Sequence, residues 1–377
     1  MLPSVAPRAA VVDAWSHEPN LDFLRTIAVL CVVVRHVLNM FSLRPVWWVN
    51  LQALGIFGVL MFFVHTSLVL MISMEKSRRT SNVSTARFWS AFLVRRFFRI
   101  YPLSMTAVLI AYFLCRPFAD SVAVRAGIAS GVQLRDLWAN LFLVQDLVVL
   151  PSVLAPLWSL PAEVQMYVVL PLLFLVVQRK GVRAIGWIVW PMSVVVAVVA
   201  WKLNTRLTVA RYAPCFVAGV GCFGLLRTRR PLAFACLPAF IGALLLAYMV
   251  AYSRFGLQAG LGILATLCLA AVIPLVATTR SIWLKRASQK VAQYSYGVYL
   301  FHVPCIWIAF GKLRWLGTAG SCLALVLLVA VASVAAYHLI EEPFIRLGKR
   351  VAGKVGRPAP QISGDRVHPA PSQLNAG

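Results

Sequence analysis

The stretch GTAGSCLALVLLVAVASVAAYHLI, residues 317–340, runs for 24 positions without a Lys, Arg, Asp or Glu. A helix of this length crosses the hydrocarbon core of a bilayer, roughly 30 Å thick, because each residue adds about 1.5 Å. The whole chain has the same character, since 61% of its 377 residues are hydrophobic and only 12% are charged. A water-soluble globular fold needs more polar surface than this composition supplies. The sequence therefore predicts an integral membrane protein.

The expected fold class is all-α, a polytopic transmembrane bundle of about ten spanning helices. A spanning helix needs roughly 20 mostly apolar residues. Ten stretches meet this condition, namely 22–40, 51–73, 97–115, 157–177, 184–201, 208–226, 231–250, 256–278, 291–311 and 317–340. The stretch 133–150 is too short and too charged to span easily, so we expect it to lie at the interface or to re-enter the membrane.

Basic residues are spread unevenly over the loops between these stretches. Lys and Arg total 36 against 11 acidic residues, an excess that in a soluble protein would suggest nucleic-acid binding. Here they cluster between apolar runs, where they meet anionic lipid headgroups. They are enriched in the two terminal tails and in every second loop, which predicts that both termini are cytoplasmic and that the protein crosses the membrane several times.

One folded domain is expected. Residues 1–20 are predicted to form a cytoplasmic tail, 21–345 the transmembrane domain, and 346–377 a basic, disordered cytoplasmic tail. The eight cysteines lie in apolar stretches without a CxxC pair or a His/Cys ligand spacing, so we interpret them as buried apolar side chains. No metal site is predicted.

The first predicted helix carries ionisable residues, which are costly in a bilayer unless they are paired or face a wet cavity. Arg25 and His36 are eleven residues apart, so they share one helix face at depths that differ by roughly 16 Å. Asp22 precedes Arg25 by three residues and is expected to hold it near the cytoplasmic edge. His36 lies toward the outer side, where it can act as a base near neutral pH. Interfacial snorkelling of Arg25 and a structural hydrogen bond of His36 are the alternatives.

Three arginines lie together at the cytoplasmic mouth of the third predicted helix. Arg96 and Arg99 share a face at i,i+3, and Arg95 lies beside them. Guanidinium groups suit phosphates, including those of coenzyme A. The alternative is an ordinary basic flank that binds lipid headgroups.

Two further segments place polar groups within apolar helices. The segment at the start of the fourth helix contains Trp158, Ser159 and Glu163, and Glu163 either positions an acceptor hydroxyl or pairs with a buried cation. The later segment contains Tyr299 and His302, which we expect to support the structure or the acceptor side rather than to carry the chemistry.

Five of these segments, in this order, resemble the membrane acyltransferase-3 family. The resemblance covers residues 20–350 and rests on short motifs. These are Arg25 with His36, Arg96-x-x-Arg99-Ile-Tyr-Pro, Trp158-Ser159-Leu-x-x-Glu163, Ser295-Tyr-Gly-x-Tyr299-Leu-x-His302, and Ile340-Glu341-Glu342-Pro-Phe. The family O-acylates bacterial surface polysaccharides, peptidoglycan and glycosides.

The resemblance implies a bacterial inner-membrane enzyme that transfers an acyl group, most simply acetyl, from cytoplasmic acyl-CoA to a saccharide hydroxyl. It implies that Arg25 and His36 are required, with His36 as base or transient acyl carrier. It also implies that the arginine segment receives the donor. One departure is that Phe62-Phe63-Val64 is followed by His65-Thr66-Ser67 without the family's glycine, which puts close backbone approach, or the acyl pocket, in doubt there. We interpret His65 as a hydrogen-bonded interhelical residue.

Other interpretations and partners stay open. The two polar residues on one face of the first helix, Arg25 and His36, also fit a transporter or exporter of a lipid-linked or anionic glycan. An inactive scaffold protein is a third possibility. The family's frequent hydrolase-like C-terminal domain is not found in the sequence. We therefore expect the membrane part to reach the acceptor itself or to work with an envelope glycan-assembly partner.

Overall fold

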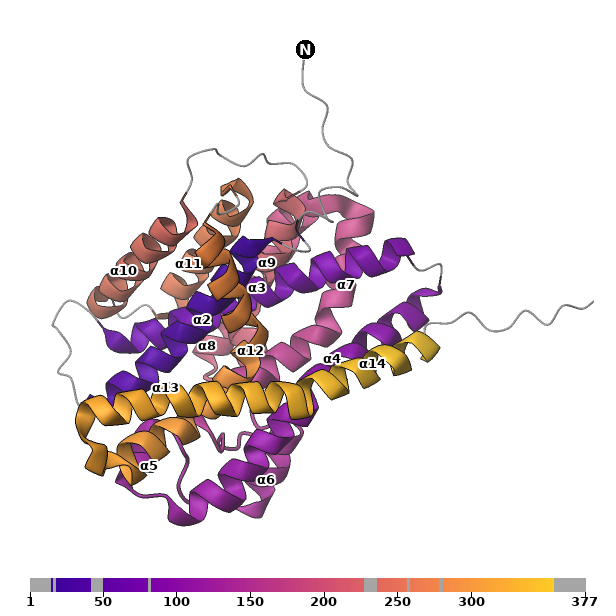
Figure 1. Cartoon of the computed structure of the whole chain (residues 1–377). Helices are drawn as coiled ribbons and strands as arrows, with labels where there is room; N and C mark the ends of the chain where they lie inside the picture. The colour runs from indigo at the N-terminus through magenta and orange to yellow at the C-terminus, as the bar shows by residue number, and fades with distance from the viewer. Residues whose placement is uncertain are drawn as a thin grey trace, which may run out of the picture.

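The computed structural model describes Trp15 and residues 18–41, 50–80, 83–226, 236–255, 258–277 and 281–355. Within these residues there is no β-strand, only one isolated antiparallel bridge between Ile128 and Leu154, so the prediction of an all-α fold is confirmed. Figure 1 shows the helices gathered in one bundle. They are α2 Pro19–Leu38, α3 Leu51–Thr80, α4 Thr85–Leu109, α5 Ser121–Ala126, α6 Leu134–Leu141, α7 Leu160–Ala184, α8 Trp190–Lys202, α9 Thr208–Leu225, α10 Leu237–Phe255, α11 Gln258–Val272, α12 Ile282–Trp307, α13 Gly317–Ala336 and α14 Glu342–Val355.

Helix starts are fixed by capping residues in the sequence. α2 has Pro19 in its first turn, and the Glu18 carboxylate accepts a hydrogen bond from the Asn20 amide at 3.4 Å. α12 follows Ser281, whose hydroxyl accepts one from the Leu284 amide at 3.3 Å. Such caps satisfy amide groups that have no partner within the helix.

The first helix of the bundle, α2, packs against both α3 and α12. Its buried face includes Leu24, Ala28 and Val32, which recur every four residues. The Thr26 hydroxyl also donates to the Ser288 carbonyl of α12 at 3.1 Å. The helix with the densest polar pattern is thus held by two neighbours.

Glycines let the neighbours of α3 approach it closely. A Cβ at Gly58 of α3 would lie 2.5 Å from the Ala28 carbonyl oxygen of α2, and one at Gly219 of α9 would lie 2.4 Å from the Val64 carbonyl oxygen. Small residues permit such contacts between membrane helices. The α3 segment after Val64 lacks the family's glycine, but Gly219 on the facing helix α9 still allows the two backbones to approach closely there.

Six helical runs in the described part are long and apolar enough to cross a membrane. They are Leu51–Thr80, Thr85–Phe118, Ala155–Lys202, Thr208–Leu225, Leu237–Arg254 and Arg314–Val355. The 48-residue run Ala155–Lys202 covers two predicted spans and is interrupted at Gly181, where φ is 76° and ψ is 176°. Three other predicted spans fall on α2, α11 and α12, which are shorter or more polar. A membrane protein is supported, and the number of ten spans stays a prediction.

The outward faces of the long helical runs are apolar. Val331 and Leu339, in the last of these runs, are 68% and 75% exposed. Large exposed apolar surfaces mark contact with another apolar phase. The lipid bilayer supplies that phase for helices of this length.

The C-terminal helices extend further than predicted. α13 and α14 lie in line across one face of the bundle, drawn in yellow in Figure 1, and helical structure runs through to Val355. The tail predicted at 346–377 was expected to have no regular structure, but residues 346–355 are helical. The reason is packing on α4, where the Phe344 and Phe98 rings stack with centroids 6.4 Å apart and Gly348 lies against Phe98. Residues 356–377, and all of 1–20 except Trp15 and 18–20, lie outside the described residues.

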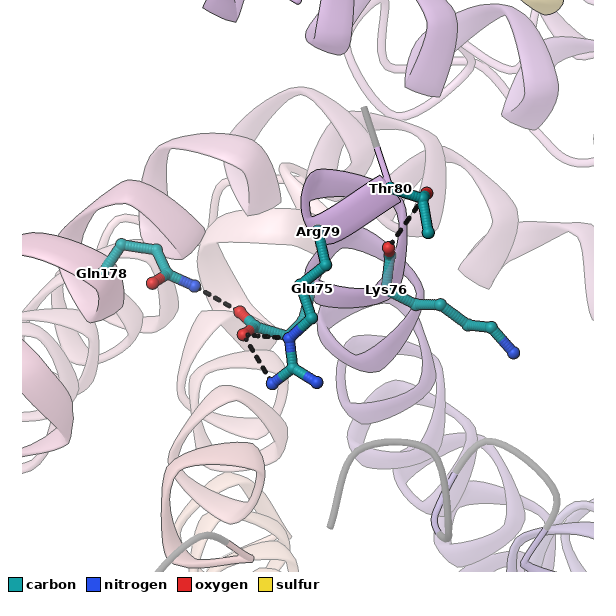
Figure 2. A network of polar contacts seen from close by, with 5 residues as sticks. All are labelled: Glu75, Lys76, Arg79, Thr80 and Gln178. Atoms are coloured by element: carbon teal, nitrogen blue, oxygen red, sulfur yellow. Dashed lines mark hydrogen bonds and ion pairs between the residues drawn. The ribbon is translucent and has the colours of Figure 1, made fainter. Parts of the chain in front are cut away.

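A buried carboxylate joins α3 to α7 (Figure 2). Glu75 of α3 accepts two hydrogen bonds from Arg79, at 3.1 and 3.0 Å, and one from Gln178 of α7. Because Glu75 is 4% exposed, these bonds replace the hydration that its charge loses on burial. The network fixes the two helices that carry one wall of the site described next.

Candidate active site

Three arginines line one buried cavity. Arg25 comes from α2, whereas Arg96 and Arg99 come from successive turns of α4. Glu163 of α7 lines the same cavity, which has a volume of about 110 Å³ and is called the arginine cavity below. Its other polar lining residues are His65, Thr66, Ser159, Tyr167, Ser295, Tyr296 and Tyr299.

Arg25 lies among charges of both signs. Arg99 is a like charge in its surroundings, and Glu341, Glu163 and Asp22 are opposite charges within electrostatic reach. The sequence suggested Asp22 as the residue that holds Arg25, because it is three positions away on the same helix. Two glutamates that are distant in sequence also attract Arg25, so tertiary contacts contribute to the charge balance of the site.

The arginines of α4 differ in their surroundings. Arg99 forms an ion pair with Glu341, with 3.3 Å between Nη1 and Oε1, and neither Glu341 oxygen has a hydrogen-bond partner among the described residues. Arg96 lies over the Phe92 ring at 5.7 Å, and its buried Nε has no hydrogen-bond partner in the same part of the chain. Arg96 thus presents its guanidinium group to the cavity, whereas Arg95 does not line it.

Glu163 is fixed by its own helix. The Tyr167 hydroxyl, one turn later in α7, donates a short hydrogen bond of 2.6 Å to Glu163 Oε1. α7 has both Pro161 and Glu163 in its first turn, where the helix dipole favours a negative charge. The glutamate is therefore an oriented carboxylate beside three guanidinium groups.

His36 lies in a second cavity of about 250 Å³, called the histidine cavity below. Its Nδ1 lies 3.2 Å from the Ala126 carbonyl oxygen at the end of α5. A carbonyl only accepts, so Nδ1 carries the proton and the Nε2 lone pair of the neutral ring is available. Gly127, with φ of 111°, lies close to the ring, since a Cβ there would be 3.4 Å from His36 Cε1. The geometry leaves Nε2 as the atom that can take a proton.

The two cavities meet at Tyr299. This residue lines both of them, and its hydroxyl donates to the Pro156 carbonyl oxygen at 2.7 Å. Ser159 Oγ lies 2.7 Å from the Tyr299 hydroxyl and lines the arginine cavity, whereas Trp158 lines the histidine cavity. Tyr299 and Ser159 therefore form the partition between the two spaces.

A third cavity, of about 430 Å³, adjoins the arginine cavity through the shared residues Arg25, His65 and Val69. Asp22 and Lys76 also line it. The charge distribution predicts that this end of α2 and α3 faces the cytoplasm. We call it the cytoplasmic cavity.

The predicted site residues thus separate into two groups. Around the arginine cavity lie Arg25, Arg96, Arg99, Glu163 and Ser159, with Glu341 paired to Arg99. Around the histidine cavity lie His36 and Trp158, with His302 beside His36, while Tyr299 belongs to both groups. Asp22 lines the cytoplasmic cavity, and Arg95 lines none of the three.

Sequence reasoning missed Tyr167 and Tyr296 and gave His65 only a structural role. Tyr167 follows Glu163 at i+4, a spacing that predicts contact on one helix face. His65 lines both cavities that contain Arg25. No group of three or more His, Cys, Asp or Glu residues that suits a metal ion occurs within the described ranges.

Comparison with known proteins agrees with this arrangement. A family model described as an acyltransferase domain matches residues 18–338, which include both cavities' polar groups. The chain belongs to the membrane acyltransferase-3 family. The acyltransferase MdmB of Streptomyces mycarofaciens is 30% identical over 177 residues, which are 45% of this chain and 42% of that protein. No solved structure matches the chain. Acyl transfer by a membrane acyltransferase-3 enzyme is thus the general activity to be explained.

Proposed function

We propose that this acyltransferase moves an acyl group, most simply acetyl, from cytoplasmic acyl-CoA to a hydroxyl of a saccharide or glycoconjugate at the outer side of the bacterial inner membrane. One observation carries the proposal. A single helix, α2, presents Arg25 to the arginine cavity and His36 to the histidine cavity, and the two cavities share Tyr299.

The donor enters from the cytoplasmic side in this proposal. Sites for drug-sized ligands hold roughly 300–1,000 Å³. The cytoplasmic cavity, at about 430 Å³, falls in that range, whereas the arginine cavity, at about 110 Å³, has room only for the reacting end of the donor. The guanidinium groups of Arg96 and Arg25, which line this cavity, supply donors to an anionic or carbonyl group there.

The acceptor approaches through the histidine cavity. His36 Nε2 takes the proton from the acceptor hydroxyl, and the oxygen attacks the thioester carbonyl carbon. In this proposal, thioester and hydroxyl meet at the boundary that Tyr299 forms between the two cavities. The carbonyl oxygen gains negative charge in the tetrahedral intermediate, and Arg25 stabilises it electrostatically from the arginine-cavity side of this low-dielectric interior. The C–S bond then breaks, the ester forms, and the departing thiolate of coenzyme A receives the proton from His36.

The same proposal places both termini in the cytoplasm, with about ten helices crossing the membrane. The enrichment of Lys and Arg in alternate loops supports this placement. It puts Arg25 near the cytoplasmic face and His36 toward the outer face. Donor and acceptor then reach the reaction from opposite sides, and envelope glycan-assembly proteins become plausible suppliers of the acceptor.

The test is transfer of radiolabel from acetyl-CoA to total glycan in membranes that contain the full chain. We compare wild type with His36→Ala and Arg96→Ala at equal protein levels. Because a general base contributes about 10²- to 10⁴-fold, His36→Ala should lose nearly all labelling. His338→Ala and Arg314→Ala are matched controls, since both side chains are exposed and line none of the three cavities.

Normal labelling by His36→Ala would remove the proposed base and favour the transporter interpretation. Loss with His36→Ala but not with Arg96→Ala would keep the base and remove the proposed donor contact. Wild-type membranes that label no glycan from acetyl-CoA would exclude acetyl-CoA as donor, and the same comparison with longer acyl-CoA thioesters would follow.

A further inference from the structure

A fourth cavity, of about 330 Å³, lies where the segment after α6 meets the start of α9. It shares no lining residue with the arginine cavity. Its lining combines a carboxylate, two guanidinium groups and two aromatic rings, supplied by Asp146, Arg206, Arg211, Trp158 and Tyr212. These residues are far apart in the sequence, and the mechanism above uses none of them for chemistry.

Asp146 is oriented as a hydrogen-bond acceptor at this cavity. The Gln165 amide nitrogen of α7 lies 2.9 and 3.2 Å from its two carboxylate oxygens, and the Thr208 amide at the start of α9 donates to Oδ2 at 3.3 Å. A carboxylate has about four lone-pair sites. Because Asp146 lines the cavity, its carboxylate can be reached by a donor from a ligand.

Arg211 is braced by its neighbours. Its guanidinium lies over the Trp201 ring at 4.6 Å and donates to Asn204 Oδ1 at 3.0 Å. The buried Nε of Arg211 has no hydrogen-bond partner in the part of the chain that the structure describes. Arg206, also in the lining, is exposed. The cavity thus offers donors as well as an acceptor.

Trp158 connects this cavity to the histidine cavity, because its side chain lines both. The Trp158 and Tyr212 rings lie with centroids 5.5 Å apart and planes tilted by 48°. They form an aromatic wall that ends beside the space where His36 lies. A ligand seated on this wall extends naturally toward the proposed base.

We propose that the fourth cavity is the acceptor subsite and binds the sugar ring whose hydroxyl is acylated. A pyranose ring has apolar C–H faces, which suit aromatic rings, and hydroxyl groups at its edge, which both donate and accept. One hydroxyl donates to Asp146, others accept from Arg206 and Arg211, and the reacting hydroxyl passes Trp158 to His36. The inference rests on the proposed function and assigns a location to its acceptor.

Orientation supports the assignment. Asp146 lies in the loop after the third predicted span, and Arg206 lies in the loop after the fifth. The alternation of basic residues predicts both loops on the outer side. The cavity therefore opens on the face where a saccharide acceptor is expected.

The test measures, by saturation-transfer NMR, the direct binding of methyl glucoside, methyl mannoside and methyl galactoside to the full chain in detergent micelles. Asp146→Asn and Arg206→Gln are the test variants. The asparagine oxygen still accepts from the Thr208 amide, and Arg206 is exposed, so both variants should fold. Loss of a hydrogen bond to a charged group weakens binding about 10- to 100-fold. Arg314→Gln is the control, because it removes a positive charge from an exposed site that does not line this cavity.

At least one methyl glycoside should bind wild type and the control equally and bind both test variants at least about tenfold more weakly. Equal binding to wild type and the test variants overturns the subsite, and so does failure of wild type to bind any of the three glycosides. The readout needs no acyl transfer. A wild-type protein that binds glycosides through Asp146 but transfers no acyl group therefore overturns the proposed function alone.

Discussion

His36 and His302 lie edge to face, with ring centroids 5.1 Å apart and planes inclined by 62°. Each Nδ1 is close to a backbone carbonyl oxygen, at 3.2 Å from Ala126 for His36 and 3.0 Å from Val298 for His302. Both rings therefore carry their proton on Nδ1 when neutral. His302 is fully buried, and its Nε2 has no hydrogen-bond partner among the described residues.

This contact predicts that His302 is a positioning residue for His36. Replacing it with Phe keeps a ring but removes both nitrogens, so the His36 ring should shift relative to the acceptor hydroxyl. We expect kcat for glycan acylation to fall about 10- to 100-fold, because small displacements of a catalytic group have effects of this size. KM for acyl-CoA should change little. Steady-state kinetics on purified protein measures both.

A merely structural role for His302 would lower the yield of folded protein and leave the pH dependence of kcat unchanged. In the positioning role, the pH dependence of kcat shifts in His302→Phe. His338→Phe is the matched control, because His338 is exposed and its partner is Glu342 rather than a site residue. An unchanged kcat and pH profile in His302→Phe would contradict the prediction.

The ion pair between Arg99 and Glu341 predicts strong coupling in stability. Removing one partner of a buried pair leaves an uncompensated charge and costs about 3–5 kcal/mol in fully buried cases. Arg99 is 27% exposed and Glu341 is not exposed, so we expect a smaller cost of about 2–3 kcal/mol for Glu341→Gln. Thermal unfolding in detergent measures it.

The double variant Arg99→Gln with Glu341→Gln should then be less destabilised than the sum of the two single variants. Additive effects would show that the two side chains do not interact in the folded protein. Wild type, the two single variants and the double variant must be compared in the same detergent and at the same protein concentration.

The approach of α9 to α3 predicts opposite outcomes for two neighbouring glycines. A Cβ at Gly219 would lie 2.4 Å from the Val64 carbonyl oxygen, whereas one at Gly221 meets nothing within 4 Å. Gly219→Ala should cost about 1–3 kcal/mol through overpacking. Gly221→Ala should be neutral or stabilising by up to about 1 kcal/mol, because alanine favours the helix. Expression level and unfolding temperature distinguish the two, and equal behaviour would contradict the close helix contact.

Asp146 predicts a pH dependence for acceptor binding. Burial raises the pKa of Asp146 above its ordinary value of 3.8, while hydrogen bonds from the Thr208 amide and Gln165 act in the opposite direction. The cations that share its cavity are Arg206 and Arg211. The ionised carboxylate accepts from the sugar, so binding should be complete above this raised pKa and decline as the pH falls through it.

Methyl glycoside binding measured from about pH 4 to pH 8 tests this sign. Wild-type affinity should decrease toward the acid end, with its midpoint above 3.8. Asp146→Asn should show a flat and weaker profile. A wild-type affinity that rises on acidification would contradict the assignment of Asp146 as an acceptor.

The helices and the charged residues of the arginine cavity were accessible to sequence reasoning because their signals are local. Apolar stretches long enough to span appear directly in the sequence, and the spacing of Arg96 and Arg99 places both on one face of a helix. The charge distribution of α14 concealed its helix, since the basic residues after Arg346 look like a solvated tail. Its packing on Phe98 through Gly348 depends on a segment about 250 positions earlier.

The division of the site could not be derived from sequence. The eleven-residue spacing puts Arg25 and His36 on one face, but Tyr299 of α12 lies between the two cavities, and the Ala126 carbonyl of α5 orients His36 in one of them. The acceptor subsite was missed for the same reason. Asp146, Trp158 and Arg211 come from different elements, and no periodic pattern links them.

The size of the arginine cavity bears on acyl-chain selectivity. Its volume of about 110 Å³ is small beside the 430 Å³ or so of the cytoplasmic cavity. Phe62, Phe63 and Leu70 form apolar walls around it, and Leu70 is 3% exposed. A long acyl chain held here would have to displace these side chains, at about 1–3 kcal/mol for overpacking. In the proposed reaction with short acyl donors, these side chains of α3 limit the chain length, and exchanging them for smaller residues should admit longer acyl groups.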